Sequence, residues 1–184
     1  MATYPNPATR MIDGVYQVYR PGGFEDIEGP RERFVGAGEF LTHTGSGALT
    51  GTAAGSGNMP GWALDKTTDE VLTAFVRLPD GWKNFAVNVL WSNASTGAGA
   101  VRWDVNYEAT AVGAARGAGT LAAATGTAST TAFLLIETIV LAASAAAAAI
   151  EAAFTTFKVS RDADHAADTL DNDAIFHGLQ LTKV

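Results

Sequence analysis

The sequence predicts an all-β protein, built as an antiparallel β-sandwich or barrel and preceded by an extended N-terminal arm. Apolar residues alternate with polar ones after Trp62, which is the period of a half-buried strand. Twenty glycines and short turn motifs separate these apolar runs. Hydrophobic residues make up 47% of the 184 residues and charged residues 17%, enough apolar material for one well-buried core.

The first sixty residues differ from the remainder of the chain. The stretch YPNPATR carries two prolines, which favour extended backbone and prevent a regular start. GVYQVYR alternates and is compatible with a strand, whereas glycine recurs too often between Gly36 and Gly61 for a helix. We therefore interpret residues 1–61 as an extended arm with a glycine-rich segment, and residues 62–184 as the β-domain.

Three amphipathic strands are predicted between residues 70 and 109, separated by Pro-Asp-Gly at 79–81 and by the turn-forming stretch SNASTGAGA. The side chains expected to face the core are Leu72, Ala74, Val76 and Leu78 in the first strand, Phe85, Val87, Val89 and Trp91 in the second, and Val101, Trp103, Val105 and Tyr107 in the third. Strands with one polar face are typical of antiparallel sheets, because parallel strands are usually apolar on both faces.

The segment from residue 110 to residue 154 gives conflicting signals. Helix propensity favours a helix in AASAAAAAIEAAF, but the flanking segments TAFLLIETIVL and FTTFKVS are rich in β-branched and aromatic residues. We expect a strand on each side, while residues 144–150 remain open between helix and turn. AIFHGLQLTKV predicts a final strand with a bulge at Gly178. Its core candidates are Ile175, His177, Leu179 and Leu181.

The charge and composition exclude several classes of protein. A formal net charge of −7 leaves no basic stripe for nucleic acid or an anionic membrane surface. The absence of cysteine excludes disulfides, a thiolate nucleophile and Cys-ligated zinc. MATYPNPATRM lacks the pattern of a secretory signal, so we expect the mature chain to start there. Glu137 and Glu151 leave an uncharged run too short for the roughly 20 residues of a membrane span.

Five aspartates between residues 162 and 173 raise the question of a metal site. They are Asp162, Asp164, Asp168, Asp171 and Asp173. The spacing does not match a calcium-binding EF-hand loop, because Ala166 and Ala167 stand where a ligand and a glycine are needed, and Asp173 replaces the bidentate glutamate. We predict a surface loop in which aspartates cap a short turn and one of them pairs with Arg161, without a bound metal.

No other pattern predicts catalysis or a cofactor. His43, His165 and His177 lack zinc-site spacing, and a surface position is the simpler interpretation of each, although His177 alternates with core candidates. The loop serines Ser46 and Ser56 have no base in an interpretable order. GSGALTG lacks the spacing, the lysine and the βαβ context of a phosphate-binding loop. The sequence therefore predicts neither an enzyme nor a cofactor site.

The order of three segments resembles that of small β-sandwich virion proteins of tailed bacteriophages. These segments are VRLPDGW, GAVRWDVNY and FKVSRDADHAADTLDNDAIFHGLQL, and the resemblance covers residues 62–184. It implies a jelly-roll-like sandwich, usually assembled as a trimer, that decorates or cements a capsid or belongs to the tail or its fibres. The alanine run departs from the pattern and leaves the strand order between residues 110 and 150 open.

The resemblance suggests partners for two sets of residues. An N-terminal arm could lie across neighbouring virion subunits, including the major capsid protein, and bury side chains there. The expected interface residues are Tyr4, Pro5, Pro7, Tyr16, Tyr19 and Phe24. In the alternative hypothesis the chain is a tail-associated receptor-binding module, in which the aspartate loop and Trp62 or Trp82 contact a host glycan.

Overall fold

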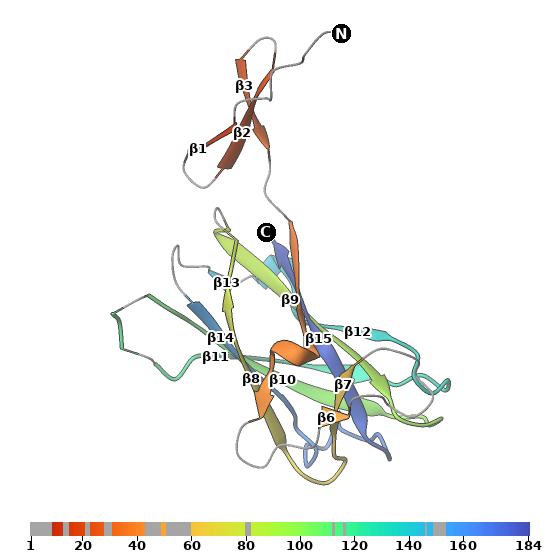
Figure 1. The fold of residues 1–184 in the computed structure, drawn as a ribbon. Helices are drawn as coiled ribbons and strands as arrows, with labels where there is room; N and C mark the ends of the chain where they lie inside the picture. The colour runs from red at the N-terminus through yellow and green to blue at the C-terminus, as the bar shows by residue number, and fades with distance from the viewer. Residues whose placement is uncertain are drawn as a thin grey trace, which may run out of the picture.

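The protein folds as an all-β structure in which two antiparallel sheets pack face to face (Figure 1), so the predicted β-sandwich is confirmed. The computed structural model describes residues 9–12, 15–20, 23–27, 31–42, 49–50, 60–79, 82–111, 113–115, 117–145, 147–148 and 154–184. Two short 3-10 turns, η1 (Ala37–Glu39) and η2 (Ala143–Ala145), are the helical elements of the described residues. None of these residues forms a helix that is long and apolar enough to cross a membrane.

The first sheet of the sandwich has five strands in the order β11-β10-β14-β8-β5. They are β11 (Thr120–Thr127), β10 (Ala100–Thr110), β14 (Phe154–Arg161), β8 (Glu70–Arg77) and β5 (Leu41–Thr42). Strands β10 and β14 pair over eight positions, from Trp103 opposite Arg161 to Thr110 opposite Phe154. This long antiparallel pair forms the centre of the sheet.

The second sheet has seven strands, five of them in the order β12-β9-β15-β7-β6. They are β12 (Ile136–Leu141), β9 (Asn84–Asn93), β15 (Ala174–Lys183), β7 (Gly61–Leu64) and β6 (Leu49–Thr50). The other two are β4 (Glu32–Gly36), which pairs with β15, and β13 (Ala147–Ala148), which pairs with β9. The long strands β9 and β15 carry the sheet.

The sandwich begins earlier in the chain than the sequence predicted. Strands β4, β5 and β6 all pair within its two sheets, so the predicted boundary at Trp62 is wrong. Val35 and Phe40 are buried in the shared core. Frequent glycines and strands of two to five residues hid this contribution, because such short strands show no clear alternation.

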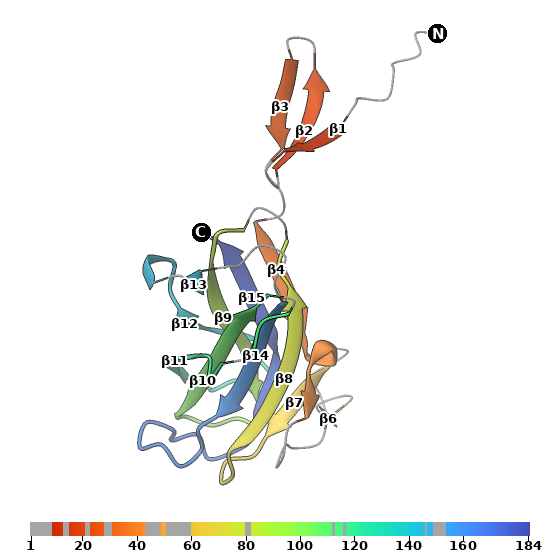
Figure 2. The same cartoon turned by 90° about the vertical axis from the view of Figure 1, so that its left-hand side faces the viewer.

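The N-terminal residues form a sheet of their own instead of an extended arm. Strands β1 (Thr9–Ile12), β2 (Val15–Arg20) and β3 (Gly23–Ile27) pair in the order β1-β2-β3 (Figure 2). Both pairings are antiparallel. The sequence indicated a strand only around β2. Pairing with neighbours on both sides satisfies backbone groups that an isolated extended arm would leave to water.

The three strands predicted between residues 70 and 109 alternate between the two sheets. Strand β8 lies in the five-stranded sheet, β9 in the seven-stranded sheet, and β10 in the five-stranded sheet again. The predicted strands are therefore correct and antiparallel, but they do not pair with one another. The chain therefore passes from one sheet to the other between β8 and β9 and back between β9 and β10, and the apolar faces of all three strands meet in the interior of the sandwich.

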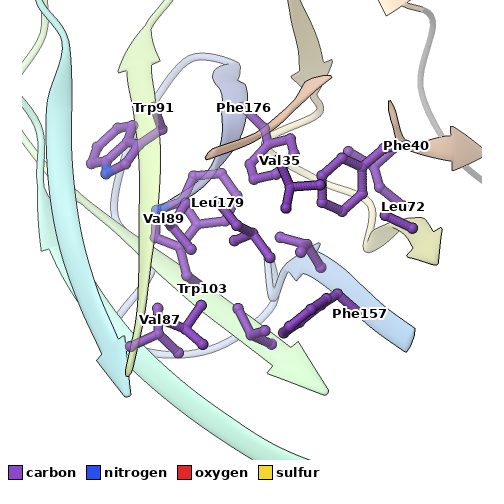
Figure 3. Close-up of a cluster of buried hydrophobic side chains, with 14 of the residues drawn as sticks. Val35, Phe40, Leu72, Val87, Val89, Trp91, Trp103, Phe157, Phe176 and Leu179 are labelled. Carbon is purple, nitrogen blue, oxygen red and sulfur yellow. The ribbon is translucent and has the colours of Figure 1, made fainter. Parts of the chain in front are cut away.

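The core contains most of the side chains that the alternation predicted in β8, β9, β10 and β15, together with residues from β4, η1 and β14 (Figure 3). The rings of Trp91 and Trp103 lie 5.8 Å apart between centroids, and those of Phe40 and Phe176 meet edge to face at 4.9 Å. The pair of Trp91 in β9 and Trp103 in β10 joins the two sheets. Aromatic contacts of this kind add to the stabilisation from burial itself.

Two local predictions of the sequence are resolved by strand pairing. The sequence left residues 144–150 open between helix and turn, and the described part of the alanine run forms the 3-10 turn η2 and the short strand β13. The bulge near Gly178 is confirmed, because the register of β15 against β9 shifts between Phe176 and Gly178. Gly178 has a φ of +154°, and a Cβ there would lie 2.4 Å from the carbonyl oxygen of Val35. Only glycine fits this position without strain.

Candidate functional site

Arg161 holds the aspartate loop from inside the protein. Its Nε and Nη2 donate to the two carboxylate oxygens of Asp168 at 3.0 and 2.8 Å. Its guanidinium also donates to the carbonyl oxygens of Leu64, Leu170 and Asn172. The predicted pairing of Arg161 with a loop aspartate is therefore correct, but Arg161 is 0% exposed and the pair is buried, whereas a surface pair was expected. The loop is an ordered structural element.

The other loop aspartates lie nearer the surface. Asp171 accepts a hydrogen bond from Lys66 Nζ at 2.5 Å, which lowers the pKa of Asp171. Asp162 and Asp164 gather with Asp69, and one carboxylate oxygen from each lies within 4.8 Å of the others. Burial and a hydrogen bond with Asp164 raise the pKa of Asp162. Carboxylate oxygens suit Ca²⁺, but these three supply fewer than the roughly six to eight oxygens it takes.

The tryptophans predicted to contact a ligand belong to the core. Trp62 is 7% exposed and Trp82 is 5% exposed, so that prediction is wrong. Both border loops in the sequence, but Trp62 lies on the inward phase of β7 and its Nε1 donates to the carbonyl oxygen of Ala37 at 2.9 Å. A carbonyl from η1 thus satisfies the indole and allows the ring to be buried.

Only some of the predicted interface residues of the arm are among the residues that the structure describes. Tyr4, Pro5 and Pro7 lie outside the described residues. Tyr16 and Tyr19 lie in β2 and Phe24 in β3, where the backbone pairing is described and the side chains are not. Their role in an interface stays a prediction.

His177 is buried, contrary to the expected surface position, whereas His165 is exposed as expected. His43 lies outside the described residues. The Nε2 of His177 lies 2.9 Å from Ser92 Oγ, and its Nδ1 lies 3.0 Å from the carbonyl oxygen of Pro60. A neutral ring that donates from Nδ1 and accepts at Nε2 satisfies both contacts. Burial lowers the pKa of His177.

The protein is expected to become less stable as the pH is lowered, because His177 is buried in its neutral form. Its folded-state pKa lies below the ordinary value of 6.5, so the unfolded chain takes up a proton that the folded chain does not. The free energy of unfolding should therefore decrease as the pH falls through 6.5 toward the lowered pKa. Urea unfolding between about pH 5 and 8 measures this slope. His177→Gln should reduce it, whereas His165→Gln, at an exposed position, should not; equal slopes in all three proteins would contradict the assignment.

A polar groove lies on the outward face of the five-stranded sheet, where β10 pairs with β14. Its volume is about 270 Å³, and its lining residues are Asn106, Glu108, Gly117, Ala118, Thr156 and Lys158. Asn106 lies opposite Lys158 and Glu108 opposite Thr156 in the strand register. These four side chains occupy the outward phase, because Tyr107 and Phe157 between them point into the core.

One wall of the groove is the loop between β10 and β11, which two of the lining side chains hold in place. Glu108 Oε1 accepts hydrogen bonds from the backbone N–H of Gly117 and from the Thr110 hydroxyl. Asn106 Nδ2 donates to the carbonyl oxygen of Ala118 at 3.3 Å. The wall is thus tied to the strand that forms the groove's floor.

Two exposed phenyl rings extend the groove across the same face of the sheet. Phe75 in β8 lies opposite Thr156, and Phe154 lies two residues before Thr156 in β14. Phe75 is 58% exposed and Phe154 is 47% exposed. A polar groove beside outward-facing aromatic rings is an arrangement suited to an amphipathic ligand. The sequence contained a signal for Phe75, an aromatic residue on the outward phase of an amphipathic strand, but it was not interpreted as functional.

Known protein structures share this architecture. One is the CBM36-1 domain of a multidomain xylanase from the hindgut metagenome of Trinervitermes trinervoides, with a TM-score of 0.53 and 10% identity over 83% of this chain and 98% of that one. Another is a family 35 carbohydrate-binding module from Clostridium thermocellum, with a TM-score of 0.46 and 11% identity over 83% and 98%. A family 11 module from Clostridium thermocellum, solved with a β-1,3-1,4-mixed-linked tetrasaccharide, has a TM-score of 0.42 and 13% identity over 83% and 96%.

The similarity to the xylanase domain, with its TM-score of 0.53, supports the fold and nothing beyond it. No protein-family model matches the chain, and no curated protein matches it in sequence. The similar structures support the β-sandwich part of the expected resemblance but give no support to its virion part. A shared fold at this level of identity does not establish function, because one sandwich architecture carries many unrelated sites.

Proposed function

We propose that the protein is a carbohydrate-binding module that holds a sugar in the groove between β10 and β14. The observation that carries this proposal is the placement of Phe75 and Phe154, both outward-facing and exposed, beside a groove lined by amide, carboxylate, hydroxyl and ammonium groups. A pyranose ring has an apolar C–H face and a polar edge of hydroxyl groups. An aromatic ring can cover the first while polar side chains bind the second.

The size of the groove and the fold add support. At about 270 Å³, the groove lies just below the roughly 300–1,000 Å³ of pockets that enclose a drug-sized ligand, which suits one or two sugar units. The xylanase domain with a TM-score of 0.53 is itself named as a carbohydrate-binding domain. We expect binding without a chemical step, because Ser92 and His177, a serine and histidine in hydrogen-bond contact among the described residues, are buried in the other sheet.

Removal of either exposed phenyl ring is expected to weaken sugar binding about tenfold, since stacking on an aromatic ring contributes on the order of 1 kcal/mol or more. The ligand would first be found on a glycan array and its affinity then measured by calorimetry for Phe75→Ala and Phe154→Ala. Phe34→Ala is the matched control, because Phe34 is 54% exposed but lies in β4 of the other sheet. Equal losses in all three variants, or none, would contradict the site.

Assembly as a trimer on a bacteriophage particle stays a prediction of the sequence. If the protein is a sugar-binding module of a phage tail, the predicted assembly on a particle and the proposed sugar binding are both correct. A capsid decoration protein would not need a sugar-binding groove. Copy number per particle separates the two, because decoration needs hundreds of copies and a tail module needs a few dozen at most.

A further inference from the structure

Not every polar group that lines the groove is available to a ligand. The amide of Asn106 donates to the carbonyl oxygen of Ala118, and Glu108 accepts the backbone N–H of Gly117. Both side chains are thereby engaged in holding the loop that forms the wall. Lys158, on the floor of the groove, does not hold the loop, so its ammonium group is available to bind a ligand.

Among the described residues Lys158 has no acidic partner, which it shares with Lys83 and Lys183 but which distinguishes it from Lys66 and Arg102. Lys66 lies 2.5 Å from Asp171, and Arg102 lies 3.5 Å from Asp104. No carboxylate of the described residues lies within 4.0 Å of the Lys158 ammonium, although the whole chain has a formal charge of −7. Lys158 is exposed, and its ammonium can donate up to three hydrogen bonds.

We infer that the sugar held in this groove carries an anionic group, the carboxylate of a uronic acid or a sulfate ester, and that Lys158 binds it. The inference rests on the proposed sugar-binding function and specifies its ligand class. Hydrogen bonds between an ammonium and an anionic oxygen are shorter and about twice as strong as neutral ones. The hydroxyl of Thr156 lines the groove beside Lys158, and Phe75 lies opposite Thr156, where it can cover the ring of the same sugar.

Because the chain is negatively charged overall, any preference for an anionic sugar must come from the local contact with Lys158. A protein of net charge −7 repels a polyanion at long range, and salt screens both this repulsion and an exposed ion pair. The inferred ligand is therefore a single acidic sugar unit within a chain, rather than a densely charged polymer. We expect its affinity to fall as the salt concentration rises above about 0.1 M.

The test measures the affinity of the full chain for three trisaccharides of the same linkage, one neutral, one containing a uronic acid and one carrying a sulfate ester. Calorimetry should show tighter binding of one of the acidic ligands by about tenfold, and Lys158→Gln should remove this preference for the acidic over the neutral ligand. Which acidic ligand binds identifies the anionic group. Lys83→Gln is the matched control, because it removes the same charge from an exposed lysine outside the groove lining.

The outcomes separate this inference from the proposed function. If the wild-type protein binds the neutral trisaccharide as tightly as the acidic ones, or if Lys158→Gln keeps the preference, the anionic ligand class is wrong while sugar binding stands. If none of the glycans on the array and none of the trisaccharides binds, the proposed function itself fails. A loss of acidic preference in Lys83→Gln equal to that in Lys158→Gln would show a general effect of charge and overturn the role of Lys158.

Discussion

Replacement of Arg161 by alanine is expected to lower the free energy of unfolding by about 3–5 kcal/mol, because it leaves the carboxylate of Asp168 buried without its charged partner. The Asp168 side chain is only 2% exposed, so water cannot replace the guanidinium. The same change removes the donors to the carbonyl oxygens of Leu64, Leu170 and Asn172. The loop between β14 and β15 would lose its anchor together with the stability of the sandwich.

Equilibrium unfolding in urea measures this loss. Lys66→Ala is the control, because it breaks an ion pair whose lysine and aspartate side chains are 42% and 90% exposed, and solvent screens such a pair so that it contributes little to stability. Arg161→Lys serves if the alanine variant does not fold, since it keeps the charge but loses the two-pronged contact with Asp168. A loss for Arg161→Ala no larger than that for Lys66→Ala would refute the anchoring role.

Replacement of Trp103 by alanine is expected to cost about 3–5 kcal/mol through the cavity it leaves in the core. Trp103 is fully buried, with its ring centroid 5.8 Å from that of Trp91 and 6.1 Å from that of Phe176 in the opposite sheet. Thermal or urea unfolding checks the value. Trp103→Phe should cost less, because it keeps an aromatic ring and removes an indole N–H that has no hydrogen-bond acceptor among the described residues.

The exposed Phe75 provides the comparison for this core substitution. Phe75→Ala should change the free energy of unfolding by about 0.5 kcal/mol or less, as is usual for surface positions, while it weakens sugar binding. The two variants thus separate residues that hold the sandwich together from residues that contact a ligand. Comparable destabilisation by Trp103→Ala and Phe75→Ala would contradict the assignment of their faces.

Much of the sandwich could be predicted because its signals are local. The alternation in β8, β9 and β10 fixes which side chains face inward, and Leu72, Trp91 and Trp103 are buried as expected. The contribution of β4 to β6 was missed, because strands this short are stabilised by partners such as β15 that lie far away in the sequence. Local alternation could not reveal that β9 lies in the sheet opposite β8 and β10.

The candidate site was not predicted, because its residues form a binding surface only when strand pairing brings them together. Trp62 was expected at the surface and lies in the core, because a carbonyl from η1 accepts its indole N–H. Phe75 and Lys158 belong to a common surface only because β14 lies between β10 and β8 in the sheet. The spacing of Phe75 and Lys158 along the sequence does not predict that they lie on the same surface.

The sequence by itself determined the fold class, the inward faces of the long strands and the pairing of Arg161 with an aspartate of its loop, because these follow from residue type and short separations. Only the tertiary structure decided that this ion pair is buried and that Trp62 and Trp82 are core residues. It also decided that Phe75, Thr156 and Lys158 lie together at a groove on one sheet. Burial and neighbourhood depend on which strands pair, and in this protein the pairing joins segments from opposite ends of the chain.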